Sequence, residues 1–301
     1  MSEVRDDRPV LSLAHSPDPD DAFMWWPLVG RDGEPPAVHD PRFRYELHAE
    51  DISVLNDRSP EEAFDITAMS CGQYPFVADR YALTACGASM GDGYGPKLVA
   101  ARPMSPEDLR DPSVVIAVPG EHTSAMMTTR LLLGAEPGAF RHEVMPFETI
   151  IDAVREGRCA AGLVIHEAQL TFEDAGLHLV ADLGRWWRGT RGELLPLGVN
   201  AIRRDLEQQH GPGTLAHVTR TLSRSLEHAL SHREISIAVA LEFARDMGAE
   251  LAGAFVDLYV NRHTLAFGDD GERAVRQWLG ELAEAGLAPA VAGPDFVHPA
   301  G

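Results

Sequence analysis

Polar side chains able to bind an anion or transfer a proton follow four short apolar segments of the sequence. These side chains belong to His15 and Ser16, Ser70, Thr123 and Ser124, and His166 and Glu167. Each apolar segment has the length of a buried strand. In open α/β sheets, ligands bind beyond the carboxyl ends of the strands, so these positions are the candidates for a binding or catalytic site.

His166 is the candidate general base, because a neutral imidazole titrates near neutral pH and can accept a proton. It follows the apolar segment 160–165 and precedes Glu167, which could orient its ring. Adjacent residues on an extended strand point to opposite faces, which argues against a direct contact between His166 and Glu167. The chain has 13 histidines, so a purely structural role for this one is the simpler alternative.

Thr123 and Ser124 are candidate anion-binding residues, because they precede an apolar segment, 125–133, that is typical of a helix. Free backbone N–H groups and the helix dipole favour negative charge at a helix start, and the two hydroxyls add donors. N-capping without any ligand is the more common role of such residues.

Two further segments resemble ligand loops but lack the required spacing. The acidic segment Asp18–Asp21 has neither the spacing nor the glycine of a calcium loop, and Asp20 or Asp21 could instead cap the helix that follows. The glycines of Gly91–Pro96 precede a strand-like segment and do not open a helix, which excludes a dinucleotide fingerprint. The three cysteines lack metal-ligand spacing. We therefore expect no metal and no nucleotide cofactor.

Composition limits the class of partner. The 301 residues are 45% hydrophobic and 24% charged, an ordinary globular mixture, and the net charge of -20 disfavours nucleic acid and anionic membranes. No segment approaches the roughly 18 apolar residues of a membrane span, and the charged N-terminus has no apolar signal core. The sequence therefore predicts a cytoplasmic protein that binds a small anionic molecule and is compatible with a homodimer.

Strand-like and helical segments alternate along the chain, which predicts an α/β fold. The predicted strands are 10–14, 44–48, 64–69, 98–101, 114–118, 160–165 and 194–198, and the predicted helices are 22–26, 53–63, 125–133, 149–156, 215–230, 235–247 and 274–285. The length suits two lobes, with 98–101 and 194–198 as crossing segments. Trp25-Trp26 and Trp186-Trp187 could stack on a planar ligand, with core packing as the alternative.

Seven stretches form an ordered set of motifs over nearly the whole chain. They are His15–Phe23, Asp65–Ser70, Gly87–Pro96, Pro119–Ala125, Ala161–Thr171, Leu195–Arg204 and Tyr259–Leu265. This set resembles the 1,4-dihydroxy-6-naphthoate synthase family of menaquinone biosynthesis. The fifth stretch, Ala-Gly-Leu-Val-Ile-His-Glu-Ala-Gln-Leu-Thr, is especially similar to that family's Ala-Gly-Leu-Ile-Ile-His-Glu-Gly-Gln-Leu-Thr.

The resemblance implies a two-lobed fold of the type II periplasmic-binding-protein kind, with a ligand cleft between the lobes. Lobe I would comprise residues 1–98 plus 199–301, and lobe II residues 99–198. The implied activity is that of a cofactor-independent lyase of the futalosine pathway, which converts cyclic dehypoxanthine futalosine into 1,4-dihydroxy-6-naphthoate. The residues implied to act are His166 as the base, and Ser16, Ser70, Thr123, Ser124, Ala125 and Asn200 in substrate binding.

Two departures leave alternatives open. Asp18 stands where the family usually has cysteine, and Asp20 where it usually has asparagine. Added carboxylates near the site of an anionic substrate are unexpected. The alternatives are a paralogue similar to chorismate dehydratase, against which the stretch His166–Gln169 argues, and a non-catalytic binding protein for a small acid, against which the lack of an export signal argues.

Overall fold

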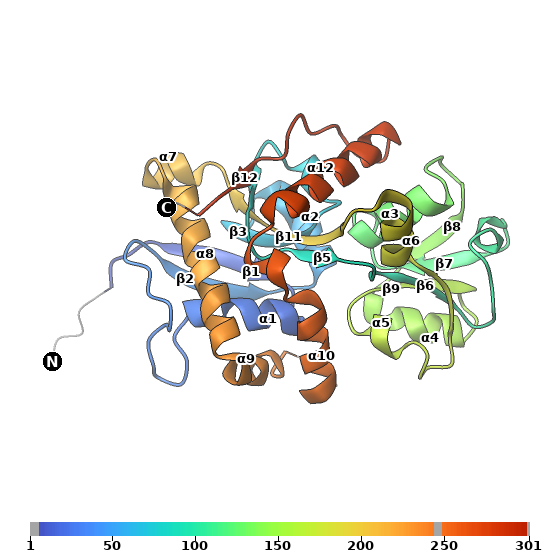
Figure 1. Cartoon of the computed structure of the whole chain (residues 1–301), viewed down its shortest axis with the longest axis horizontal. Helices are drawn as coiled ribbons and strands as arrows, with labels where there is room; N and C mark the ends of the chain where they lie inside the picture. The colour runs from blue at the N-terminus through green and yellow to red at the C-terminus, as the bar shows by residue number, and fades with distance from the viewer. Residues whose placement is uncertain (1–5, 244–248, 300–301) are drawn as a thin grey trace.

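Two β-sheets, each flanked by helices, divide the protein into two lobes (Figure 1). The structure is a computed structural model and describes residues 6–243 and 249–299. One sheet has seven strands and the other has five. The predicted α/β class is therefore confirmed.

The seven-stranded sheet belongs to the first lobe and has the order β12-β4-β11-β3-β1-β2, with β5 paired to β11. β1 is parallel to β2 and β3, whereas β11 is antiparallel to β3, β4 and β5. The strands are β1 (Val10–His15), β2 (Arg44–Ala49), β3 (Ile66–Ser70), β4 (Tyr81–Thr84), β5 (Ser89–Gly91), β11 (Leu195–Arg203) and β12 (Phe296–Val297). The carboxyl ends of β1 and β3 therefore lie at one edge.

The five-stranded sheet belongs to the second lobe and has the order β10-β6-β9-β7-β8. β7 is parallel to β8 and β9, and β6 is antiparallel to β9 and β10. The strands are β6 (Lys97–Ala100), β7 (Val115–Val118), β8 (Arg141–Val144), β9 (Ala161–Val164) and β10 (His178–Asp182). The carboxyl ends of β7 and β9 lie at the edge that faces the first lobe (Figure 1).

Helices cover both sheets. Those of the first lobe are α1 (Pro19–Trp25), α2 (Ile52–Arg58), α7 (Leu206–His210), α8 (Thr214–Ser231), α9 (Arg233–Ala240), α10 (Ala249–Tyr259), α11 (Arg262–Leu265) and α12 (Gly268–Glu284). Those of the second are α3 (Ser124–Leu133), α4 (Ile150–Arg155), α5 (Ala168–Thr171) and α6 (Leu183–Arg191). Leu11 and Leu13 of β1 share one buried core with Phe23 and Trp25 of α1. That packing holds the loop between β1 and α1 in place.

The lobe boundaries drawn from the sequence, after residues 98 and 198, fall inside strands. β6 belongs to the second sheet from its first residue, since Lys97 pairs with Val164. β11 belongs to the first sheet from its first residue, since Leu195 pairs with Gly91. The chain therefore crosses at 92–96 and returns between β10 and β11. Composition cannot distinguish a crossing segment from a short buried strand, and only the hydrogen-bonded partners decide.

The first crossing packs closely against the start of α6. A Cβ atom added to Gly184 would lie 1.9 Å from the carbonyl oxygen of Tyr94, and one added to Gly95 would lie 3.0 Å from the backbone nitrogen of Gly184. The two backbone segments are in direct contact at this point and leave no space for a Cβ atom, which requires glycine at both positions. The glycine-rich segment therefore lets the chain cross from the first lobe to the second beside α6.

Some helix ends differ from those predicted. α2 ends at Arg58, because Pro60 lies in a separate 3₁₀ turn, Ser59–Glu61. α9 ends at Ala240, and residues 244–247 of the predicted helix 235–247 lie outside the described residues. No helix among the described residues is long and apolar enough to cross a membrane.

Candidate functional site

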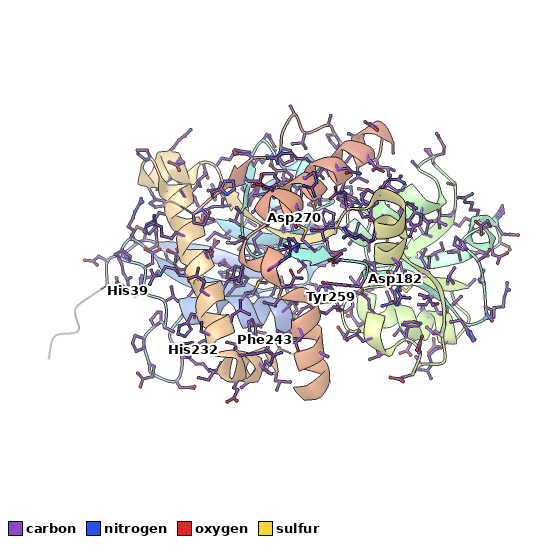
Figure 2. The ribbon with its side chains drawn as sticks, in the orientation of Figure 1. His39, Asp182, His232, Phe243, Tyr259 and Asp270 are labelled. Atoms are coloured by element: carbon purple, nitrogen blue, oxygen red, sulfur yellow. The ribbon has the colours of Figure 1, made fainter. Side chains whose placement is uncertain are left out.

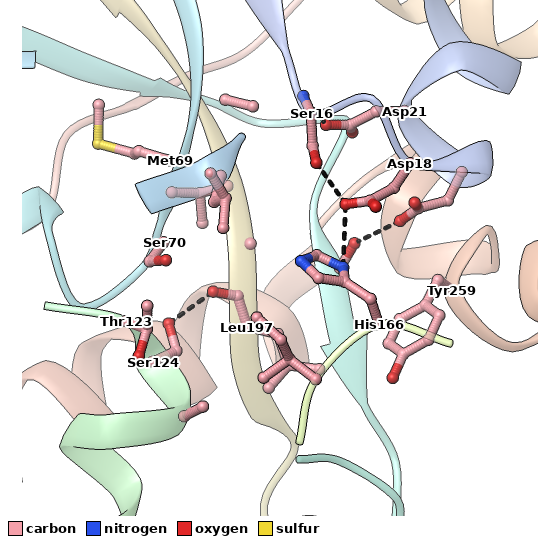
Figure 3. Close-up of a pocket in the computed structure, with 18 of the residues that line it drawn as sticks. Ser16, Asp18, Asp21, Met69, Ser70, Thr123, Ser124, His166, Leu197 and Tyr259 are labelled. Carbon is pink, nitrogen blue, oxygen red and sulfur yellow. Dashed lines mark hydrogen bonds and ion pairs between the residues drawn. The ribbon is translucent and has the colours of Figure 1, made fainter. Parts of the chain in front are cut away.

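A cavity of about 110 Å³ lies between the lobes, beyond the carboxyl ends of β1, β3 and β9 (Figure 3). Both lobes contribute to its wall. All seven residues predicted for the site line it: Ser16, Ser70, Thr123, Ser124, Ala125, His166 and Asn200. The loops selected by the rule that ligands bind beyond strand ends therefore lie together around one cavity.

The tryptophan pairs do not line this cavity. Trp25 and Trp187 are completely buried in the core, and Trp187 Nε1 donates to the carbonyl oxygen of Leu194 at 2.9 Å. Trp26 Nε1 donates to Ser236 Oγ at 2.9 Å. The stacking hypothesis is wrong for this cavity, and core packing accounts for these side chains.

The loop after β1 and the first turn of α1 place three carboxyl groups on one wall of the cavity. Asp18 is the N-cap residue of α1, but its side chain makes no capping hydrogen bond. Asp21 Oδ2 accepts from the backbone N–H of Ser16 at 2.8 Å, and the Ser16 hydroxyl donates to Asp18. The predicted capping by Asp20 or Asp21 is therefore wrong, because both lie inside the first turn. These carboxyl groups face the cavity instead.

His166 reaches the same wall from the second lobe. Its Nδ1 lies 2.9 Å from Asp18 Oδ2, and its buried Nε2 has no hydrogen-bond partner in the part of the chain that the structure describes. Figure 3 shows the ring nitrogen opposite Asp18 pointing toward the open middle of the cavity. The residue has a φ of 52°, in the left-handed region, which costs a non-glycine residue about 1 kcal/mol or more. Phe147 packs edge-on against the imidazole, and the centroids of the two rings are 4.7 Å apart.

The partner of His166 is Asp18, which the sequence analysis did not foresee. Burial alone lowers the pKa of an imidazole, but the Asp18 carboxylate, with Glu167 and Asp20 nearby, outweighs burial and raises the pKa of His166 to about 9. The ligand-free protein therefore carries His166 mainly as a cation near neutral pH. The general-base role predicted from the sequence requires the neutral form.

The other two carboxyl groups hold their protons more tightly than usual. Burial, together with the charge of Asp18, raises the pKa of Asp20 to about 6. Burial, together with Asp20, raises the pKa of Asp21 well above its ordinary value. The wall therefore carries less negative charge than three carboxyl groups imply, which lessens the conflict with an anionic ligand.

The opposite wall is formed by the start of α3. Thr123 is its N-cap, and the Thr123 hydroxyl accepts from the N–H of Met126 at 3.1 Å. Ser124 Oγ donates to the carbonyl oxygen of Leu197 at 2.5 Å. Both hydroxyls are therefore already hydrogen-bonded within the protein. The first-turn N–H groups of Ser124 and Ala125 have no acceptor within the helix, so these backbone groups are the donors that an anion would meet.

Ser70 and Asn200 complete the lining from the first sheet. Ser70 Oγ accepts from Asn56 Nδ2 at 3.0 Å, which orients the hydroxyl. Asn200 Nδ2 donates to the carbonyl oxygen of Gly87 at 2.7 Å, and Asn200 Oδ1 is buried with no partner among residues 6–243 and 249–299. Asn200 can therefore accept one hydrogen bond from a ligand.

Gln169 and Tyr259 line the cavity but were not among the predicted site residues. They join the lobes, because Tyr259 Oη and the Gln169 side-chain amide are 2.9 Å apart. Figure 2 labels Tyr259 at the end of α10, on the side that faces the second lobe. Both residues lie within the recognised motifs, which is the signal that could have found them.

The described residues contain no group of three or more His, Cys, Asp or Glu side chains placed to hold a metal ion. Cys71, Cys86 and Cys159 are free and buried. Burial raises the pKa of Cys86 to about 12, so its thiol is a poor nucleophile near neutral pH.

Comparison with known proteins identifies the family. Residues 11–284 match the family model described as menaquinone biosynthesis. The chain belongs to the menaquinone biosynthesis family. A 1,4-dihydroxy-6-naphthoate synthase of Streptomyces coelicolor is 37% identical over 289 residues, covering 95% of this chain and 97% of the relative. The enzyme of the same name from Thermus thermophilus is 35% identical over 289 residues, covering 96% and 99%.

Solved structures support the fold of this member of the menaquinone biosynthesis family. A protein from Archaeoglobus fulgidus has a TM-score of 0.81 at 34% identity, covering 92% of this chain and 98% of that one. The alkanesulfonate-binding protein of Xanthomonas axonopodis pv. citri, solved with MOPS, has a TM-score of 0.68 at 12% identity, covering 94% and 96%. At that identity the likeness shows the fold alone. The predicted fold of the periplasmic-binding-protein kind is therefore confirmed.

Proposed function

We propose that this chain converts cyclic dehypoxanthine futalosine into 1,4-dihydroxy-6-naphthoate, with His166 as the general base. The observation that carries the proposal is the position of His166, which lines the cavity between the lobes and whose buried Nε2 has no hydrogen-bond partner among the described residues. The names of the two relatives agree with this activity. The chain would thus act as a lyase in the futalosine pathway.

The chemistry follows from the two nitrogens of the ring. In the neutral form, Nδ1–H donates to Asp18, which leaves the lone pair of Nε2 directed at the cavity. A substrate C–H bond placed against Nε2 breaks, an N–H bond forms, and the electron pair remains on the substrate to drive ring opening. A well-placed general base contributes about 10²–10⁴-fold to the rate.

The two walls suit the two ends of such a substrate. An anionic group would bind the N–H groups at the start of α3, where the helix dipole favours negative charge. The reacting carbon would then lie toward His166. Closing both lobes around the molecule holds it in one orientation and excludes water.

The test is to incubate the purified protein with cyclic dehypoxanthine futalosine and to follow naphthoate absorbance. We expect product to form. A parallel incubation with chorismate, in which loss of chorismate is measured, identifies a chorismate dehydratase. Tight binding of a small acid without any turnover would show a binding protein and would overturn the proposal.

A further inference from the structure

We propose that Asp18 is a positioning residue that reaches across the cavity from the first lobe, holds Nδ1 of His166, and thereby makes Nε2 the basic nitrogen. This inference rests on the proposed function of His166 and adds a second residue to it. The contact that carries it is the 2.9 Å approach of Asp18 Oδ2 to His166 Nδ1.

The two partners come from different lobes. Asp18 lies between β1 and α1 of the first sheet, and His166 lies between β9 and α5 of the second. Any hinge motion that opens the cavity must therefore separate them. Other contacts also bridge the lobes around the cavity, among them Tyr259 with Gln169, and the N–H of Gly72 with Ser124 Oγ at 3.2 Å.

Asp18 is itself held in place. The Ser16 hydroxyl donates to the same oxygen, Oδ2, that contacts His166. The carbonyl oxygen of Ser16 lies 2.7 Å from Nδ1 of His15, which fixes the loop behind it. The Asp18 side chain is only 8% exposed. The carboxylate is therefore placed before a substrate arrives, which is the condition for orienting a catalytic ring.

An ionised carboxylate can only accept hydrogen bonds. When His166 is neutral, Asp18 therefore keeps the ring proton on Nδ1 and leaves the lone pair on Nε2. When Nε2 takes a proton from the substrate, the resulting imidazolium lies against an opposite charge in a buried site. Asp18 thus favours both the correct tautomer before proton transfer and the product of that transfer.

Other charged or titratable groups also act on this ring. From the first lobe these are Asp20 and Asp21 of α1, and Glu167 is adjacent in the chain. Tyr259 of α10 lines the same cavity. Among the carboxyl groups, the contact at hydrogen-bond distance is made by Asp18. A change at Asp18 should therefore alter the titration of His166 more than a change at the others.

The experiment compares kcat/KM against pH for the wild type, Asp18→Asn and Asp18→Glu. An opposite charge at this distance typically shifts a pKa by about 1–3 units. In Asp18→Asn we expect the ascending limb of the profile, along which His166 loses its proton, to move to lower pH by about that amount. We also expect the alkaline plateau of kcat to fall at least about tenfold, because the amide can donate to Nδ1 and place the proton on Nε2. Asp18→Glu keeps the charge, so its kcat/KM should rise over the same pH range as in the wild type.

Asp40→Asn is the matched control. Asp40 Oδ1 lies 2.8 Å from Nε2 of His217, so this pair also joins a carboxylate to an imidazole. The Asp40 side chain is buried, and neither residue lines the cavity. Its loss can lower stability but should leave the pH profile unchanged. An unchanged ascending limb in Asp18→Asn, or an equal shift of that limb in Asp40→Asn, would overturn the inference.

A second readout separates this inference from the proposed function. The ring nitrogens of His166 can be titrated by ¹⁵N NMR in the ligand-free protein, without any substrate. Absence of naphthoate from the wild type refutes the proposed function alone. Normal turnover with identical His166 titrations in the wild type and Asp18→Asn refutes the role of Asp18 alone.

Discussion

The Asp18–His166 pair makes the stability of the ligand-free protein depend on pH. The pKa of His166 rises from 6.5 to about 9 in the folded chain. A group whose pKa is higher in the folded state stabilises that state fully below the unfolded pKa, and loses this effect as the pH rises through the folded pKa. The difference between these two pKa values corresponds to about 3 kcal/mol of unfolding free energy. The His166 side chain is 17% exposed, so solvent screens the pair only weakly.

The assay is urea unfolding, followed by tryptophan fluorescence, at about pH 6.5, 8 and 10 in the wild type and in His166→Gln. Comparing the two proteins at each pH cancels groups that titrate alike in both. Between the lowest and highest pH, the wild type should lose about 3 kcal/mol of unfolding free energy relative to His166→Gln. Asp18→Asn should lose much less. Parallel pH dependences in the wild type and His166→Gln would refute the assignment of a raised pKa to His166.

Two further predictions concern packing and charge. Gly184→Ala should lower the unfolding free energy by about 1–3 kcal/mol, because its Cβ would lie 1.9 Å from the Tyr94 carbonyl oxygen. Gly189→Ala, in the same helix with nothing within 4 Å of its added Cβ, should leave stability unchanged or higher in the same urea titration. Because the pKa of Asp20 is raised to about 6, its ionisation opposes folding above pH 3.8. Asp20→Asn should therefore gain stability relative to the wild type as the pH rises from about 4 to 8, and a constant difference would contradict this.

The sequence was sufficient to find the loops of the site, for a simple physical reason. Parallel strands of one sheet place their carboxyl ends at the same edge. The polar residues after Ala14 and Met69 therefore lie together if those two strands share a sheet, and so do the polar residues after Val118 and Ile165. Four of the strand segments, including 114–118 and 160–165, could be recognised as short apolar runs bounded by turn residues. The short strands β4, β5, β8, β10 and β12 were not predicted, because their two to five residues carry no clear period.

The contacts within the site could not be read from the sequence. Asp18 and His166 are 148 positions apart in number, and no local pattern shows that they meet at 2.9 Å. The sequence offered Glu167 as the adjacent carboxylate and argued against a direct contact with it, and the pair forms instead between two lobes. The role of Ser124 also depends on a tertiary partner, since its hydroxyl donates to the carbonyl oxygen of Leu197. Thr123 instead caps α3 locally through Met126, which is the alternative role that the sequence had offered.

Removal of the His166 imidazole tests the central claim most directly. Naphthoate formation from cyclic dehypoxanthine futalosine should fall by about 10²–10⁴-fold in His166→Ala, and added imidazole should restore part of it. His142→Ala, which removes a histidine paired with Glu121 outside the cavity, should retain the rate of the wild type. A His166→Ala protein that turns over as fast as the wild type would contradict the account.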